Sequence, residues 1–212
     1  ITPTPVAKLL PLPSKPAPSP VLQTALKPLL LTEFKSQIGA KGVISDDGTV
    51  LVSGKNGKDT YRLTATVPDG APITAIRIEV LPDETLPSRG PGRAANGNFV
   101  LSEFSAVILP TATQKKETPV VFHAVTADYS QTGWPVTNAL DGKQDTGWGI
   151  AGAIGKSHSA LFTIQKGLVV EGGSVLAFVL SQQFTDGRHS IGKFRLLVEQ
   201  EAQNSAPVKK LK

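Results

Sequence analysis

Hydrophobic and polar residues alternate in short runs along most of the chain, and glycine, proline, asparagine or aspartate separates the runs. β-Branched and aromatic residues are concentrated in these runs, as expected for half-buried strands. The pattern predicts strands over residues 28–36, 48–54, 59–67, 73–81, 98–109, 118–127, 158–165, 174–184 and 190–200. Helical periods do not appear between them. We therefore predict an all-β fold, an antiparallel β-sandwich of the jelly-roll type.

Two turn signals and one polar break lie between the predicted strands. Asp47-Gly48 and Asn56-Gly57 are each typical of a β-hairpin. Residues 110–118 are polar and could divide two domains. We interpret them as a loop, because neither half of the chain alone has enough strands to bury two sheet faces without leaving a long unpaired edge strand.

The two ends of the chain differ in composition from its body. Residues 1–27 carry proline at every second to sixth position, which blocks helices and ladder hydrogen bonds and favours extended geometry. They are predicted to be a semi-rigid linker or a strap lying on the domain. The predicted single sandwich domain then covers residues 28–200, and residues 201–212 form a basic polar tail.

Composition narrows the possible chemistry. The chain has 20 glycines and 17 prolines among 212 residues, which suits short strands joined by turns. Cysteine is absent, so disulfides, thiolate zinc sites, iron–sulfur clusters and c-type haem attachment are excluded, and we expect no haem in this chain. An apolar run of roughly 20 residues is also missing, so no membrane span is expected.

The net charge of +5 is concentrated at the ends of the chain. Lys8, Lys15 and Lys27 precede the first acid, and three further lysines close the sequence. Without these tails the body is close to neutral, so nucleic acid is not an expected partner. The sequence begins at Ile1 without the profile of a signal peptide, and we expect it to be processed or cut from something longer.

Two long stretches, residues 74–104 and 127–198, resemble a module of planctomycete-type cytochrome proteins. Those proteins are large exported polypeptides that join a c-type cytochrome segment to domains of unknown function. The resemblance implies a periplasmic, cell-surface or secreted location, with other domains of the same parent protein as partners. The parent could be an oxidoreductase, whereas this chain alone is not expected to be an enzyme.

The stretch from Ala139 to Trp148 is similar to a second family. It fits the Ala-x-Asp-Gly-x-x-x-Thr-x-Trp loop of discoidin or galactose-binding-like jelly rolls, which include many carbohydrate-binding modules. In those modules the loop commonly wraps a structural calcium ion, and the tryptophan packs into the core. The resemblance implies calcium ligands from the side chains of Asp141 and Thr146 and from the backbone oxygens of Asn138 and Lys143.

The charge of this loop leaves an alternative open. Calcium takes six to eight oxygen ligands, and Asp141 is the one certain carboxylate. Lys143 stands where relatives often carry an acid or an amide, and Glu199 or Glu201 could supply a second carboxylate. Without metal, Asp141 would accept backbone N–H groups as in an Asx turn, and Asp145 would face solvent.

Several residues are candidates for ligand contact. Trp134 precedes a proline in a turn, where its indole could stack on a sugar or pack against the loop. Residues 90–98 formally satisfy a dinucleotide fingerprint, but the required strand and helix do not flank them. The arginines and asparagines there either recognise a ligand or tie the loop down. The candidates for ligand contact are Trp134, Arg89, Arg93, Asn96 and His158.

Catalytic constellations are not apparent. Asp186, His189 and Ser190 are neighbours in sequence, which seldom form a triad, and a turn explains them better. Gln182 and Gln183 end a predicted strand and could exchange hydrogen bonds with a ligand, although polar strand ends usually face water.

We therefore predict a non-catalytic module that binds a polysaccharide, which would be acidic if the basic tails fold back onto the body. The alternative is an architectural domain that docks catalytic or cytochrome segments and has no small ligand of its own.

Overall fold

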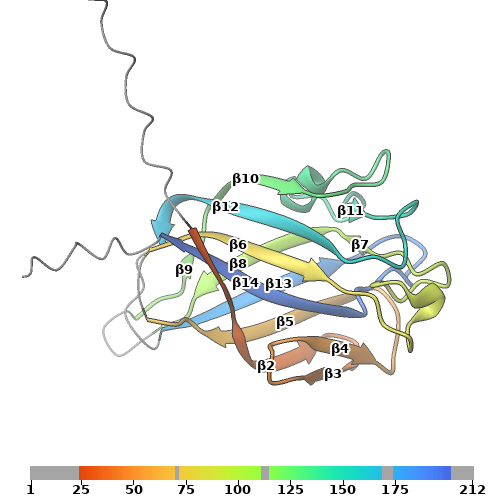
Figure 1. Ribbon diagram of the computed structural model, residues 1–212, viewed down its shortest axis with the longest axis horizontal. Helices are drawn as coiled ribbons and strands as arrows, with labels where there is room; N and C mark the ends of the chain where they lie inside the picture. The colour runs from red at the N-terminus through yellow and green to blue at the C-terminus, as the bar shows by residue number, and fades with distance from the viewer. Residues whose placement is uncertain (1–23, 70–71, 111–114, 169–173, 202–212) are drawn as a thin grey trace, which may run out of the picture.

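Two antiparallel sheets pack face to face in the computed structural model, which confirms the predicted β-sandwich (Figure 1). The structure describes residues 24–69, 72–110, 115–168 and 174–201. The larger sheet contains, in spatial order, β10 (Phe122–Ala127), β12 (His158–Leu168), β6 (Ile73–Val80), β14 (Lys193–Glu201), β4 (Val50–Ser53) and β3 (Lys41–Ile44), with β1 (Thr24–Pro28) also paired to β14. The smaller sheet contains β2 (Leu30–Ser36), β5 (Asp59–Thr66), β13 (Val175–Gln182), β8 (Glu103–Ile108) and β9 (Thr118–Pro119).

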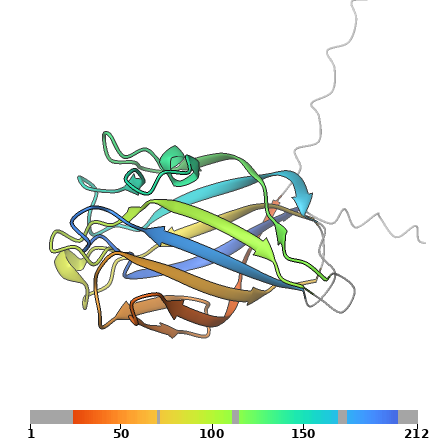
Figure 2. The same cartoon turned by 180° about the vertical axis from the view of Figure 1, so that it is seen from behind.

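The chain crosses repeatedly between the two sheets, as in a jelly roll. It passes from β4 in the larger sheet to β5 in the smaller one, back to β6, and then to β8. The smaller sheet faces the viewer in Figure 2. A short pair, β7 (Val100–Leu101) with β11 (Trp148–Gly149), and two 3-10 turns, η1 (Pro87–Arg89) and η2 (Val136–Leu140), lie among the loops at one end.

Aromatic side chains from both sheets meet in the core. Phe104 of the smaller sheet packs on Phe162 of the larger sheet, with ring centroids 4.2 Å apart. Phe122 and Phe178 complete the cluster. Trp148 is fully buried and packs edge-on against Phe99, which confirms the prediction that it belongs to the core. Removing this apolar area from water is the main favourable contribution to folding.

Strand register decides which side chains of the smaller sheet face outward. One row across three paired strands points into the core: Tyr61, Leu180 and Phe104. The next row points away from the core: Thr60, Ser181 and Glu103. Successive residues of a strand alternate between faces, so the two rows are tied to each other. A polar row therefore lies on the outer face at the loop end of the sheet.

The structure corrects three details of the sequence prediction. Thr24–Pro28 forms β1 and pairs with β14, so the sandwich starts before residue 28 and residues 24–27 are not linker. Residues 1–23 and 202–212 lie outside the described part of the chain. Lys41–Ile44 forms β3, a strand that the pattern missed. Asn56-Gly57 is not a hairpin turn, because the strands on either side, β4 and β5, belong to different sheets.

Asp47-Gly48 does form the predicted hairpin between β3 and β4. Gly48 adopts a positive φ of 79°, and its N–H donates to the Ser45 carbonyl oxygen at 2.9 Å. A residue without a Cβ atom adopts this conformation without strain.

Replacing Phe104 by alanine should destabilise the fold by about 3–5 kcal/mol, because it leaves a cavity in the aromatic cluster that joins the two sheets. Urea unfolding measures the change. Val43→Ala is the control, since Val43 is 63% exposed and should change the unfolding free energy by less than about 0.5 kcal/mol. Equal effects of the two substitutions would contradict this description of the core.

Candidate functional site

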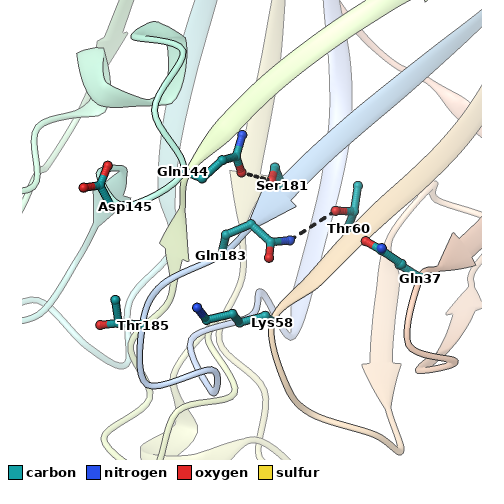
Figure 3. Close-up of a pocket in the computed structure, with 8 residues that line it drawn as sticks. All are labelled: Gln37, Lys58, Thr60, Gln144, Asp145, Ser181, Gln183 and Thr185. Atoms are coloured by element: carbon teal, nitrogen blue, oxygen red, sulfur yellow. Dashed lines mark hydrogen bonds between the residues drawn. The ribbon is translucent and has the colours of Figure 1, made fainter.

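A polar cleft of about 590 Å³ lies at the loop end of the smaller sheet (Figure 3). It collects residues from β5, β13 and the loops beside them, and no apolar side chain lines it. The lining residues are Gln37, Lys58, Thr60, Gln144, Asp145, Ser181, Gln183 and Thr185. Such a lining offers hydrogen-bond donors and acceptors rather than an apolar surface.

One wall of the cleft is the loop between η2 and β11. The Ser181 hydroxyl donates to Gln144 Oε1 at 2.6 Å, and the Ser102 hydroxyl donates to the Gln144 carbonyl oxygen at 3.1 Å. These two bonds fasten the loop to Ser181 of the outer row and to Ser102, which is buried between β7 and β8. They leave the Gln144 amide N–H₂ group without a partner among the described residues.

Gln183 forms the floor next to β5. Its Nε2 donates to the Asp59 carbonyl oxygen at 3.0 Å and to Thr60 Oγ1 at 3.3 Å, which fixes the side-chain amide. Its Oε1 and the ammonium group of Lys58 point toward the same space (Figure 3). Within the described parts of the chain, neither group has a hydrogen-bond partner. The cleft thus presents a fixed hydrogen-bond acceptor, Gln183 Oε1, beside a free hydrogen-bond donor, the Lys58 ammonium group.

A buried carboxylate holds the far wall. Asp59 is 1% exposed and accepts hydrogen bonds from the Ser36 hydroxyl at 2.5 Å and from the Thr60 N–H group at 2.7 Å. Ser36 also accepts from the Ala40 N–H group, so the turn that carries Gln37 is tied to β5. The cleft therefore has walls that are formed before any ligand arrives.

Two aromatic side chains contact each other near the lining residues in sequence. Trp134 contacts Phe184 edge-to-face, with centroids 5.0 Å apart and planes at 85°. Phe184 stands between the lining residues Gln183 and Thr185 in sequence and also contacts His189 at 4.7 Å. Trp134 is half-buried and does not line the cleft, so the structure connects this predicted contact residue to the lining only through Phe184.

The loop proposed from sequence to hold calcium closes on itself. Asp141 Oδ1 accepts from the Lys143 N–H group at 2.9 Å, and Asp141 Oδ2 accepts from the Thr146 hydroxyl at 2.8 Å. Partial burial raises the pKa of Asp141, but the hydrogen bonds from the Thr146 hydroxyl and the Lys143 N–H group outweigh this effect. The pKa of Asp141 is therefore below its ordinary value. These are the bonds of an Asx turn, the metal-free alternative. Asn138 lies in η2 just before the loop.

A second carboxyl group lies beside Asp141, and it comes from β8. Burial raises the pKa of Glu103 above its ordinary value, and the neighbouring Asp141 carboxylate adds to that rise, while the Gly142 and Lys143 N–H groups oppose it. Glu103 Oε1 is buried and has no hydrogen-bond partner among the described residues. The Asp141 carboxylate therefore has the Thr146 hydroxyl on one side and the Glu103 carboxyl group on another.

The acids that the sequence suggested as second ligands are elsewhere. Glu199 pairs with Arg77 at 3.0 Å on the outer face of the larger sheet, so it does not reach Asp141. The side chain of Glu201 is outside the described part of the structure. Glu103 was missed because it lies 38 residues before Asp141, and only strand register brings β8 under the loop. Groups of three or more His, Cys, Asp or Glu side chains suited to a metal do not occur among the described residues.

The three candidates of the β6–β7 loop lie apart from the cleft lining. Arg93 is 9% exposed, and its guanidinium group donates to the carbonyl oxygens of Lys55 and Gly54, each at 2.7 Å. Asn96 Oδ1 accepts from the Asn98 N–H group at 3.1 Å. These two side chains tie the loop down.

Arg89 of the same loop is exposed and pairs with Glu84 at 2.8 Å. Ser88 and Arg89 both have positive φ, 51° and 54°. The tip of this loop is therefore strained as well as exposed.

His158 is also committed to the fold. It is 6% exposed, with Nδ1 2.9 Å from Asp128 Oδ2 and Nε2 2.8 Å from the Ala153 carbonyl oxygen. Both ring nitrogens therefore have partners within the protein. The side chain joins the start of β12 to the preceding loop and does not line the cleft.

Asp186, His189 and Ser190 do not converge as a triad. His189 Nδ1 lies 2.7 Å from Asp186 Oδ1, but the Ser190 hydroxyl donates to Asn56 Oδ1 at 2.8 Å. These contacts order the loop between β13 and β14, which carries Thr185 into the cleft.

Comparison with protein-family models, curated proteins and solved structures found no match to this chain. In the described part of the chain, no helix is long and apolar enough to cross a membrane.

Asp83 anchors the β6–β7 loop, and Asp83→Asn should weaken the fold in a pH-dependent way. Hydrogen bonds from Thr85 and the Lys193 ammonium group, 2.9 Å away, lower the pKa of Asp83 to about 2. Because its pKa is lower in the folded state, the Asp83 carboxylate stabilises the fold at pH values above its ordinary pKa of 3.8. This stabilisation is lost as the pH falls from about 5 to about 2.

We expect the free energy of unfolding of Asp83→Asn to be about 1 kcal/mol lower than that of the wild type at pH 7, with solvent screening included. Below about pH 2 the two free energies should be equal. Urea unfolding at both pH values measures the loss. Glu84→Gln, which breaks an ion pair whose side chains are 72% and 77% exposed, is the control and should have a smaller effect. A loss of the same size at both pH values would contradict the assigned role.

Proposed function

We propose that this chain is a non-catalytic module that binds a polysaccharide in the polar cleft, on behalf of a larger exported protein. The observation that carries the proposal is the pairing of a fixed acceptor, Gln183 Oε1, with the free donor Lys58 in one preformed cleft. Sugar hydroxyl groups donate and accept at the same time, so they need both kinds of group at close range.

The shape and surroundings of the cleft support the same ligand class. It is open to solvent on one side and lies on the outer face of a rigid sheet, where a polymer can be bound without threading a chain end. Hydroxyl and amide groups from four separate segments surround it, including Thr185 and Gln37. The Trp134–Phe184 pair would supply apolar area for the ring of a neighbouring sugar.

Calcium binding at the Asp141 loop belongs to this proposal. The Asp141 and Glu103 carboxyl groups and the Thr146 hydroxyl would hold the ion, with the carbonyl oxygens of Asn138 and Lys143 as the backbone ligands suggested by sequence. The ion would neutralise the two adjacent acids and satisfy the buried Glu103 oxygen. Since the same loop carries Gln144 and Asp145, it would also stiffen one wall of the cleft.

Gln183→Ala should weaken polysaccharide binding about tenfold, because it removes the acceptor that the structure fixes in the cleft. Affinity electrophoresis in gels containing galactan, xyloglucan or mannan measures the retardation. Gln165→Ala on β12 is the matched control, as Gln165 is exposed and does not line the cleft. It should bind like the wild type.

Two outcomes would count against binding at this cleft. If no polysaccharide retards the wild-type protein, the binding function is wrong and the architectural alternative gains support. If Gln183→Ala binds as tightly as the wild type and melts at the same temperature, the polysaccharide is bound elsewhere.

Adding calcium to chelated protein should raise the melting temperature, since an ion at a hundredfold excess over its Kd stabilises by about 2.7 kcal/mol. Glu103→Gln should lose most of this shift. In chelated protein the same variant should melt no lower than the wild type, because it removes one of two adjacent acids. Glu33→Gln, at a half-buried glutamate on β2 that pairs with Lys35, is the control. An unchanged wild-type melting temperature would exclude the calcium site.

A further inference from the structure

The cleft carries one acid and one base, and every other lining side chain is uncharged. Lys58 approaches from the segment before β5, and Asp145 approaches from the loop between η2 and β11. Figure 3 shows them on different sides of the cleft, with the Gln183 side chain next to Lys58. Neither side chain forms an ion pair or a hydrogen bond within the described residues, so both charges are available to a ligand.

We infer that the cleft selects an uncharged polysaccharide and that Asp145 is the residue that rejects anionic ones. This inference rests on the proposed polysaccharide binding and adds the ligand class. An anionic sugar would gain from Lys58 but meet the unpaired Asp145 carboxylate in the same small space. A neutral sugar can donate a hydroxyl to Asp145 and accept from Lys58, and so use both groups.

Two sources of attraction to anionic polymers have to be separated. The net charge of +5 owes much to lysines at the two ends of the sequence. Attraction of anionic polymers to exposed lysines is screened by salt, with a Debye length of about 3 Å at 1 M. A preference set by close contacts in the cleft is screened much less. High salt therefore separates the two effects.

The test compares wild-type protein with Asp145→Asn in affinity electrophoresis. The neutral probes are galactan, xyloglucan and mannan, and the anionic probes are polygalacturonate and alginate, all run in low salt and in 0.5 M sodium chloride, a roughly 4 Å Debye length. Asp69→Asn is the control, because Asp69 is exposed, lies away from the cleft lining and changes the net charge by the same amount.

We expect the wild type in high salt to be retarded by a neutral probe and not by the anionic ones. Asp145→Asn should gain about tenfold in affinity for the anionic probes and keep its neutral affinity within about threefold, while Asp69→Asn should match the wild type. Lys58→Gln in the Asp145→Asn background should remove the gained affinity, which places the anion in the cleft.

Three results would overturn the inference. If the wild type in high salt binds anionic and neutral probes equally, or if Asp145→Asn behaves like Asp69→Asn, selectivity by Asp145 is wrong while polysaccharide binding stands. If neither kind of probe retards the wild type, the proposed function itself fails and the inference fails with it.

Discussion

The register of three strands in the smaller sheet is the constraint on which the rest of the structure depends. Pairing of Leu180 with Tyr61 and Phe104 points three large side chains into the core. The next pairing, of Ser181 with its two neighbours, then has to point outward. A slip of one residue would expose the aromatic row and bury the polar one, so packing of the core also fixes the floor of the cleft.

The loops at the cleft end obey a second constraint, the need of buried backbone groups for hydrogen-bond partners. Arg93 satisfies two carbonyl oxygens of another loop, and His158 satisfies a third. Asn98 is 4% exposed and connects Ile150 to Gln131. Long irregular segments can therefore be rigid here. The consequence is that polar residues in conspicuous loops serve the fold, whereas the cleft uses less conspicuous glutamines and hydroxyls.

The Asp141 loop joins structural and proposed functional roles. Its first and last residues close the turn, and its middle residues, Gln144 and Asp145, reach the cleft. Glu103 under the loop adds a second acid that the protein alone leaves incompletely satisfied. The interaction between Asp141 and Glu103 therefore acts on the same loop that forms one wall of the proposed binding site.

The sequence by itself predicted most of the strands, the class of fold and the burial of Trp148, because alternation is a local property. For the Asp141 loop it left a calcium site and an Asx turn as alternatives. It also named Gln182 and Gln183 together as polar strand ends, of which Gln182 is buried and Gln183 lines the cleft. Only the tertiary structure decided which polar residues meet. Glu103 reaches Asp141, and Lys58 reaches Gln183, through strand register and sheet packing between distant segments, which no local pattern encodes.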